Sequence, residues 1–153
     1  MKSLISKSLL FLCLIGISLP AFTQDQQSIQ VMTFNIRYNN PNDGVNAWPN
    51  RKDAVAELIG SRYRVDFAGL QEALKDQCAD LEQQLPDYAW IGVGRDDGKE
   101  AGEFCPIFYR KERFELLDHA TFWLSETPDV PGKKGWDAAC NRVVTWGKFK
   151  DRQ

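Results

Sequence analysis

The chain contains 153 residues, of which 19 are Lys or Arg and 21 are Asp or Glu, so its formal net charge at pH 7 is −2. Without residues 1–23, which we interpret below as a removable signal, 17 basic residues stand against 21 acidic ones, and the net charge is −4. An acidic protein gains no general attraction to phosphate backbones, so a phosphate-bearing substrate has to be held by a metal ion or by a few Arg and Lys side chains. The composition excludes a nonspecific nucleic-acid coat, and we expect no stable nucleic-acid partner.

The first 23 residues have the layout of a secretory signal peptide. Two lysines precede an apolar run at residues 8–19, and the small residues Ala21 and Thr23 follow it. This order predicts cleavage after Thr23. The alternative is a membrane anchor, but the apolar run is shorter than the ~20 residues that a span requires. We therefore expect residues 24–153 to form a secreted or periplasmic protein with no membrane span.

Three cysteines remain after signal removal, namely Cys78, Cys105 and Cys140. An odd number permits at most one disulfide bond within the chain, and the spacing fits no zinc motif. The sequence leaves the pairing open and favours buried free thiols.

The first half of the mature chain alternates strands and helices. Residues 28–36 alternate with apolar side chains in both registers, which predicts a strand buried on both faces. Residues 39–44 are rich in turn formers and predict a loop. A helix is expected from Asn50, a good N-cap, and residues 65–71 form a short apolar strand after it.

A second amphipathic helix is expected over residues 74–85, ending before Pro86. Further strand-like runs cover residues 88–93, 104–109, 114–118, 120–124 and 142–149. Polar loops occupy residues 96–102 and 125–139. This order indicates an α/β fold in which helices cover one face of a sheet, and we expect the layer that covers the other face to lie outside this chain.

Two polar residues close apolar strands, Asn35 in the first strand and Glu72 after the second. A carboxylate at the end of a strand is held rigidly and can bind a hard cation such as Mg²⁺. An amide beside it can donate to a phosphate oxygen or fix a water molecule. On spacing alone, Asn35 as a turn residue and Glu72 as a first-turn helix acid are equally good interpretations.

The surrounding motifs decide between these interpretations. Residues 32–37 read Met-Thr-Phe-Asn-Ile-Arg and residues 69–72 read Gly-Leu-Gln-Glu, which resembles the opening pair of motifs of the endonuclease/exonuclease/phosphatase superfamily. The match continues through residues 102–109, 121–125 and 135–146, which resemble a secreted bacterial branch, and so covers nearly all of residues 29–149. The resemblance implies part of a deoxyribonuclease-like four-layer α/β/β/α sandwich that hydrolyses phosphate esters with Mg²⁺ or Mn²⁺.

The resemblance also implies roles for three residues, and the position of a fourth, Arg142, indicates another. Glu72 matches the metal-binding Glu of the superfamily, and Asn35 matches the Asn beside the metal and the scissile phosphate, so both are assigned to the metal site. Glu103 falls where some nucleases of the family place a Glu that orients the catalytic His; the alternative is a solvated loop carboxylate. Arg142 begins a strand after a Gly-containing loop, where its guanidinium can clamp a phosphate; the alternative is an ordinary edge-strand Arg.

The mechanism of the resembled enzymes needs residues that this chain does not match. They use a His near an Asp-Asn pair and a final Asp-His pair to generate the nucleophile. The single histidine here, His119, matches none of these positions, and we expect it in a turn between two strands without a catalytic role.

A complete two-sheet sandwich needs ~200–250 residues. We therefore expect the chain to be the N-terminal half of a longer hydrolase, with a missing C-terminal half as its partner, and residues 24–153 alone to be inactive and unstable. The alternative is a noncatalytic binding module that keeps half of the fold. The phosphate-ester substrate stays open among nucleic acid, phospholipid, inositol phosphate and sugar phosphate.

Overall fold

The computed structural model describes residues 28–153, so the predicted signal peptide lies outside the described residues. In chain order the elements are β1 (Val31–Asn35), the 3-10 helix η1 (Pro41–Asn46), α1 (Trp48–Glu57), the π-helical turn η2 (Leu58–Arg62), β2 (Phe67–Gln71), α2 (Lys75–Gln84), β3 (Tyr88–Ile91), β4 (Ile107–Arg110), β5 (Phe114–Trp123) and β6 (Val143–Asp151). Within the described part of the chain, no helix combines the length and apolar character needed to cross a bilayer.

Four strands form a mixed sheet in the order β1-β2-β4-β3. β1 and β2 are parallel, whereas β4 is antiparallel to both β2 and β3. In the parallel pair Asn35 lies opposite Gln71, so the residues that follow the two strands emerge at the same edge of the sheet.

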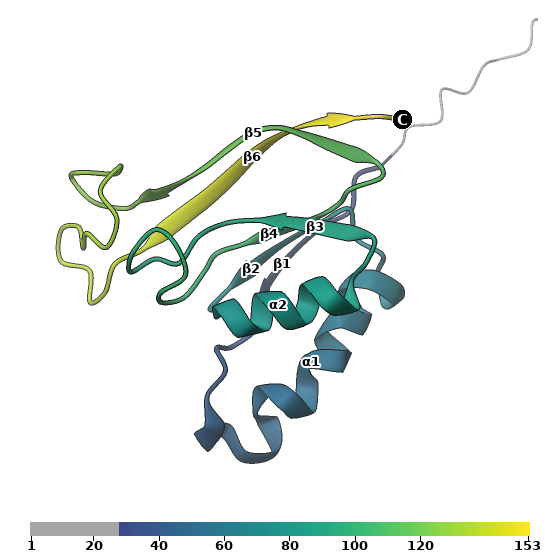
Figure 1. Ribbon diagram of the computed structural model, residues 1–153, viewed down its shortest axis with the longest axis horizontal. Coiled ribbons are helices and arrows are strands. Elements are labelled where there is room, and N and C mark those ends of the chain that lie inside the picture. The colour runs from purple at the N-terminus through teal and green to yellow at the C-terminus, as the bar shows by residue number, and fades with distance from the viewer. Residues whose placement is uncertain (1–27) are drawn as a thin grey trace, which may run out of the picture.

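The helices cover one face of this sheet, and the β5-β6 hairpin lies on the other side (Figure 1). The main core packs between the helices and the sheet, and its largest fully buried members are Ile36, Trp48, Ile59, Leu70, Leu81, Phe104 and Phe108. A smaller cluster packs between the sheet and the hairpin, where the Phe149 ring lies 4.9 Å from the Phe67 ring and 4.8 Å from the Tyr109 ring. The α/β class expected from the sequence is confirmed, but the expectation that no part of this chain covers the second face was wrong, since the β5-β6 hairpin packs there (Figure 1).

The second helix is confirmed, whereas the start of the first was wrong. α1 begins at Trp48 rather than after Asn50, because Pro49 suits the first turn of a helix and the extended residue Ala47 takes the N-cap position. The Asn50 side chain instead donates to the carbonyl oxygens of Gly44 and Val45, each at 3.3 Å. Part of the expected 39–44 loop is the 3-10 helix η1.

Two strand predictions also need correction. The runs at 114–118 and 120–124 are one strand, β5, since a bulge between Leu116 and Asp118 absorbs the irregularity and His119 pairs with Gly147 instead of making a turn. β1 is not buried on both faces: Val31 is 72% exposed. The reason is that β1 lies at the edge of the four-stranded sheet, whereas the hairpin packs against β2, β3 and β4.

A buried ionic cluster ties the hairpin to the sheet. The Arg113 guanidinium, whose side chain is 7% exposed, lies 3.0 Å from the carboxylate of buried Asp66 and 2.8 Å from that of Asp151. The hydrogen bond from Arg113 lowers the pKa of Asp151, and the same bond raises the pKa of Arg113. Because Asp66 precedes β2 and Asp151 ends β6, this cluster fixes the hairpin against the sheet.

Candidate active site

The side chains of Asn35 and Glu72 meet at the edge where β1 and β2 end. Asn35 Nδ2 donates to Glu72 Oε1 at 2.9 Å. Glu72 has a φ of +60°, a left-handed conformation that costs a residue other than glycine about 1–3 kcal/mol. Such strain persists where the surrounding structure imposes it. In this conformation the Glu72 carboxylate, which follows β2, reaches Asn35 at the end of β1.

The Asn35 side-chain amide is oriented by the backbone of Arg37. Its Oδ1 accepts from the Arg37 amide at 2.9 Å, which leaves its nitrogen to face the carboxylate of Glu72. In this orientation the amide holds Glu72 in place, and one Nδ2 hydrogen remains for another acceptor. The assignment of Asn35 as a metal ligand stays a prediction.

Two residues that the sequence analysis did not single out hold the end of β1. The fully buried Gln77 side chain donates to the Arg37 carbonyl at 2.9 Å and accepts from the amides of Asn39 and Leu74. Arg51 donates to the carbonyl oxygens of Ile36 and Arg37. Gln77 lies three residues after Leu74 and four before Leu81, so a polar residue on the apolar stripe of α2 was the available signal.

Arg37 also lies at this edge, but its charge is engaged. Its Nε lies 3.0 Å from Asp43, and its guanidinium lies 4.3 Å from the centroid of the Tyr38 ring. The hydrogen bond from Arg37 lowers the pKa of Asp43. This pair anchors η1 beside the strand ends.

Glu103 is brought to the same edge by a short bridge between chain segments. Phe104, which follows it, pairs with Ala73, which follows Glu72, and the Phe104 amide donates to the Ala73 carbonyl at 2.6 Å. Glu103 Oε2 lies 2.7 Å from Arg95 Nη1, and the Glu103 side chain is 23% exposed. Glu103 is therefore a half-buried, paired carboxylate and not a freely solvated one.

Arg142 lies directly before β6 and is exposed. Burial raises the pKa of the Cys105 thiol; the Glu103 charge adds to this rise, and the Arg95 and Arg142 charges oppose it. The described residues bring the Asn35 and Glu72 side chains into contact and place the Glu103 backbone next to the segment that follows Glu72, whereas Arg142 lies at the end of the loop before β6.

His119 lies apart from this group. It is exposed in the middle of β5 and lines a cavity of about 490 Å³ between the hairpin and the β3 edge. Cys78, Cys105 and Cys140 are all free; Cys78 is buried, and the other two are half-buried.

The donor set at the strand ends suits a hard cation. Across residues 28–153, no group of three or more His, Cys, Asp or Glu side chains is arranged to hold a metal ion. Mg²⁺, however, is commonly held by one or two carboxylates together with water and substrate phosphate oxygens. Glu72 fits that pattern, because Asn35 engages only its Oε1 in the hydrogen bonds of the described residues.

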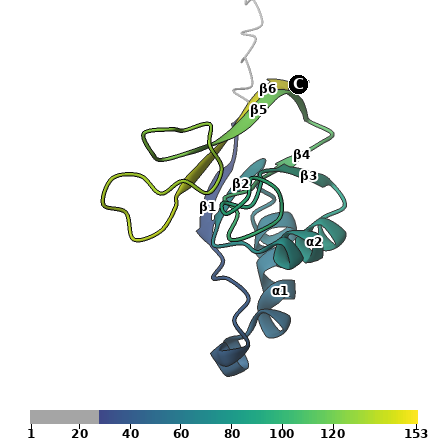
Figure 2. The ribbon, with the colours of Figure 1, turned by 60° about the vertical axis from the view of Figure 1, so that its left-hand side comes forward.

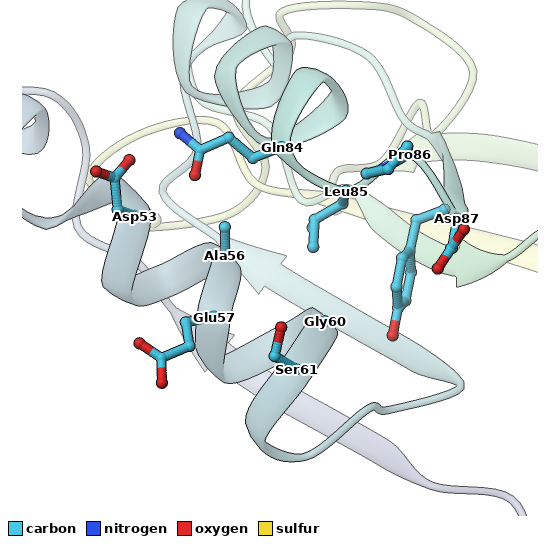
Figure 3. A pocket seen from close by; sticks show the side chains of 10 residues that line it. Asp53, Ala56, Glu57, Gly60, Ser61, Gln84, Leu85, Pro86 and Asp87 are labelled. Carbon is cyan, nitrogen blue, oxygen red and sulfur yellow. The ribbon is translucent and has the colours of Figure 1, made fainter.

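A second pocket lies between the helices, away from the strand ends (Figure 3). Its volume is about 290 Å³, and it is lined by Asp53, Ala56, Glu57, Gly60, Ser61, Gln84, Leu85, Pro86, Asp87 and Tyr88. Because α2 starts beside Glu72 and the pocket lies at its other end, about 15 Å of helix separate the two places. This pocket is not part of the strand-end site.

The chain is similar to solved structures from Bacteroides species. It is 54% identical to an endonuclease/exonuclease/phosphatase protein from Bacteroides vulgatus, with a TM-score of 0.80 over 81% of this chain and 47% of that one. It is 42% identical to a mannosyl-6-phosphatase from Bacteroides thetaiotaomicron, with a TM-score of 0.78 over 82% of this chain and 47% of that one. The chain spans about half the length of these relatives.

Comparison with curated sequences points to the same group. The chain is 38% identical over 72 residues, or 47% of its length, to Carbon catabolite repressor protein 4 homolog 5 from Arabidopsis thaliana, of which it covers 15%. No family model matches the chain. The fold, the strand-end motifs and the likeness to named members together show that the chain belongs to the endonuclease/exonuclease/phosphatase superfamily and forms part of its α/β/β/α fold.

Proposed function

We propose that the protein hydrolyses a phosphate ester with the help of a divalent metal ion, Mg²⁺ or Mn²⁺. The observation that carries this proposal is the Asn35–Glu72 pair, in which a strained Glu is held by an amide at the common end of two parallel strands. Positions that keep such strain are frequently functional. The likeness to a mannosyl-6-phosphatase supports the same chemistry.

Glu72 would hold the ion through the carboxylate oxygen that Asn35 leaves free. When bound, the ion supplies Lewis-acid stabilisation of charge on the phosphoryl oxygens. Asn35 keeps the carboxylate in its orientation and offers its second Nδ2 hydrogen to a phosphate oxygen. Arg142 binds the phosphate through its planar guanidinium, and Glu103, whose segment pairs with the one that follows Glu72, orients a neighbouring catalytic group.

The group that accepts the proton from the attacking water is proposed to lie outside residues 28–153. His119, the one histidine of the sequence, lies in the middle of β5 and not at the strand ends. This division of the site is part of the proposal for the intact protein.

We further propose a sugar phosphate as the first substrate class to test. One relative is named a mannosyl-6-phosphatase, and the identity to it is 42%. The exposed Trp136, 68% accessible, lies in the loop that precedes Arg142 and provides an aromatic face for a sugar ring.

A substrate panel tests the proposal. The intact protein is incubated with mannose 6-phosphate, glucose 6-phosphate, bis-p-nitrophenyl phosphate and single-stranded DNA, each with Mg²⁺, with Mn²⁺ and with EDTA. We expect metal-dependent release of inorganic phosphate from a hexose phosphate. Absence of hydrolysis of every ester with both metals would contradict the function and favour a noncatalytic binding module.

A further inference from the structure

Two long loops lie at the end of the molecule where β1 and β2 end (Figures 1 and 2). The first loop, residues 92–106, joins β3 to β4, and the second loop, residues 124–142, joins β5 to β6. The first carries Glu103 and the second ends at Arg142. How these loops are held therefore determines where two of the site residues lie.

The Arg95 carbonyl joins the two loops. It accepts from Trp123 Nε1 at 2.6 Å and from Asn141 Nδ2 at 2.8 Å. Asn141 Nδ2 is also 3.0 Å from Asp96 Oδ1. The loops touch closely beside these bonds, since a Cβ atom at Gly132 would lie 2.5 Å from the Asp96 carbonyl oxygen.

The Arg95 side chain acts within the first loop. Its Nη1 lies 2.7 Å from Glu103 Oε2, and the two backbones are joined by the bond from the Arg95 amide to the Glu103 carbonyl at 3.1 Å. The Arg95 and Glu103 side chains are only 19% and 23% exposed, so solvent screens this ion pair less than an ordinary surface pair. The buried Arg95 Nε is 3.8 Å from Asp96 Oδ1 and has no hydrogen-bond partner among the described residues, so the pair between Nη1 and Glu103 is the principal side-chain contact of Arg95.

We propose that Arg95 is a positioning residue that sets Glu103 and Arg142 together. Its side chain fixes the Glu103 carboxylate in the first loop, and its carbonyl holds Asn141, the residue that precedes Arg142. This inference rests on the proposed function, because it gives Arg95 a role only through residues assigned to phosphate-ester hydrolysis. The inference also states that the two loops are coupled, so that loosening the first loop loosens the second.

The test measures kcat and KM for mannose 6-phosphate with saturating Mg²⁺ in the intact protein. Arg95→Gln should lower kcat/KM by about 10–100-fold, as loss of a supporting partner at such sites commonly does. Arg95→Lys should recover part of the loss, because its ammonium still pairs with Glu103. Asn141→Ala, which keeps the ion pair but removes the link to Arg142, should act mainly by raising KM.

A double mutant and a control separate positioning from general damage. Arg95→Gln combined with Glu103→Gln should be within twofold of Glu103→Gln alone, because Arg95 acts through Glu103. Arg152→Gln removes an exposed pair with Glu115, at 3.7 Å on the hairpin, and should stay within twofold of the wild type. Arg95→Gln within twofold of the wild type, or losses that multiply in the double mutant, would overturn the inference.

Amide hydrogen exchange provides a readout that needs no turnover. Arg95→Gln should speed exchange in both loops and Arg152→Gln in neither, whereas faster exchange in residues 92–106 alone would overturn the coupling. A wild type that hydrolyses no phosphate ester would contradict the proposed function, and the exchange data would still decide whether Arg95 couples the loops.

Discussion

Replacing Gln77 with Met is the sharpest test of how the site edge is built. Gln77 is fully buried and makes three hydrogen bonds, to the Arg37 carbonyl and to the amides of Asn39 and Leu74, at 2.9–3.0 Å. Met has similar length and no amide, so the core volume is kept while these three backbone groups lose their partner. Each unsatisfied buried group costs about 1–3 kcal/mol, and partial access of water lowers the total to about 2–5 kcal/mol.

The assay is urea unfolding of the intact protein. The midpoint should fall by roughly 1–2 M, given m-values of about 1–3 kcal/mol per M. Gln83→Met is the matched control, because Gln83 is exposed on the same helix and its substitution should change stability by less than about 0.5 kcal/mol. Equal midpoints for Gln77→Met and Gln83→Met would refute the view that Gln77 holds the end of β1.

Three further outcomes follow from the strain and the pKa shifts. Glu72→Gly should be inactive yet about 1 kcal/mol more stable than Glu72→Ala in thermal unfolding, because glycine adopts the left-handed conformation without a Cβ penalty. An Ala variant as stable as the Gly variant would contradict the strain at Glu72. The hydrogen bond from Arg113 lowers the pKa of Asp151. Ionised Asp151 therefore stabilises the fold fully at pH values above the ordinary Asp pKa of about 3.9, and this contribution is lost as the pH falls through the lowered pKa. Asp151→Asn should therefore reduce the drop in urea midpoint between about pH 6 and about pH 3, and an unchanged drop would contradict the assignment. Burial raises the pKa of Cys78 to about 12, so iodoacetamide should label it at about pH 8 only after unfolding, and equally fast labelling of the native protein would contradict its burial.

Local sequence patterns predicted the elements that place the site. The apolar strands ending at Asn35 and before Glu72, and the amphipathic helix over 74–85, depend on periodicity and on a following proline, and all three exist in the structure. The start of α1 was wrong because a good N-cap residue, Asn50, competed with a proline that favours the first turn.

Features set by tertiary contacts could not be predicted in the same way. Periodicity does not show that a bulge lets β5 run through His119, or that the hairpin leaves Val31 exposed. The sequence left a site role and a solvated loop carboxylate both open for Glu103, because its partner, Arg95, is eight residues away across a loop. The orientation of the Asn35 amide depends on the Arg37 backbone, which no spacing rule specifies.

The central claim is that Glu72 holds the metal ion of a phosphoesterase site, and it is tested by Glu72→Gln in the intact protein. The substitution keeps the shape of the side chain and removes one charged oxygen ligand, so kcat/KM for the best substrate should fall by at least about 100-fold, and the thermal midpoint should stay near that of the wild type. Mg²⁺ titration of the same variant should show weaker binding. Turnover close to the wild type at saturating Mg²⁺ would contradict the assignment of the site.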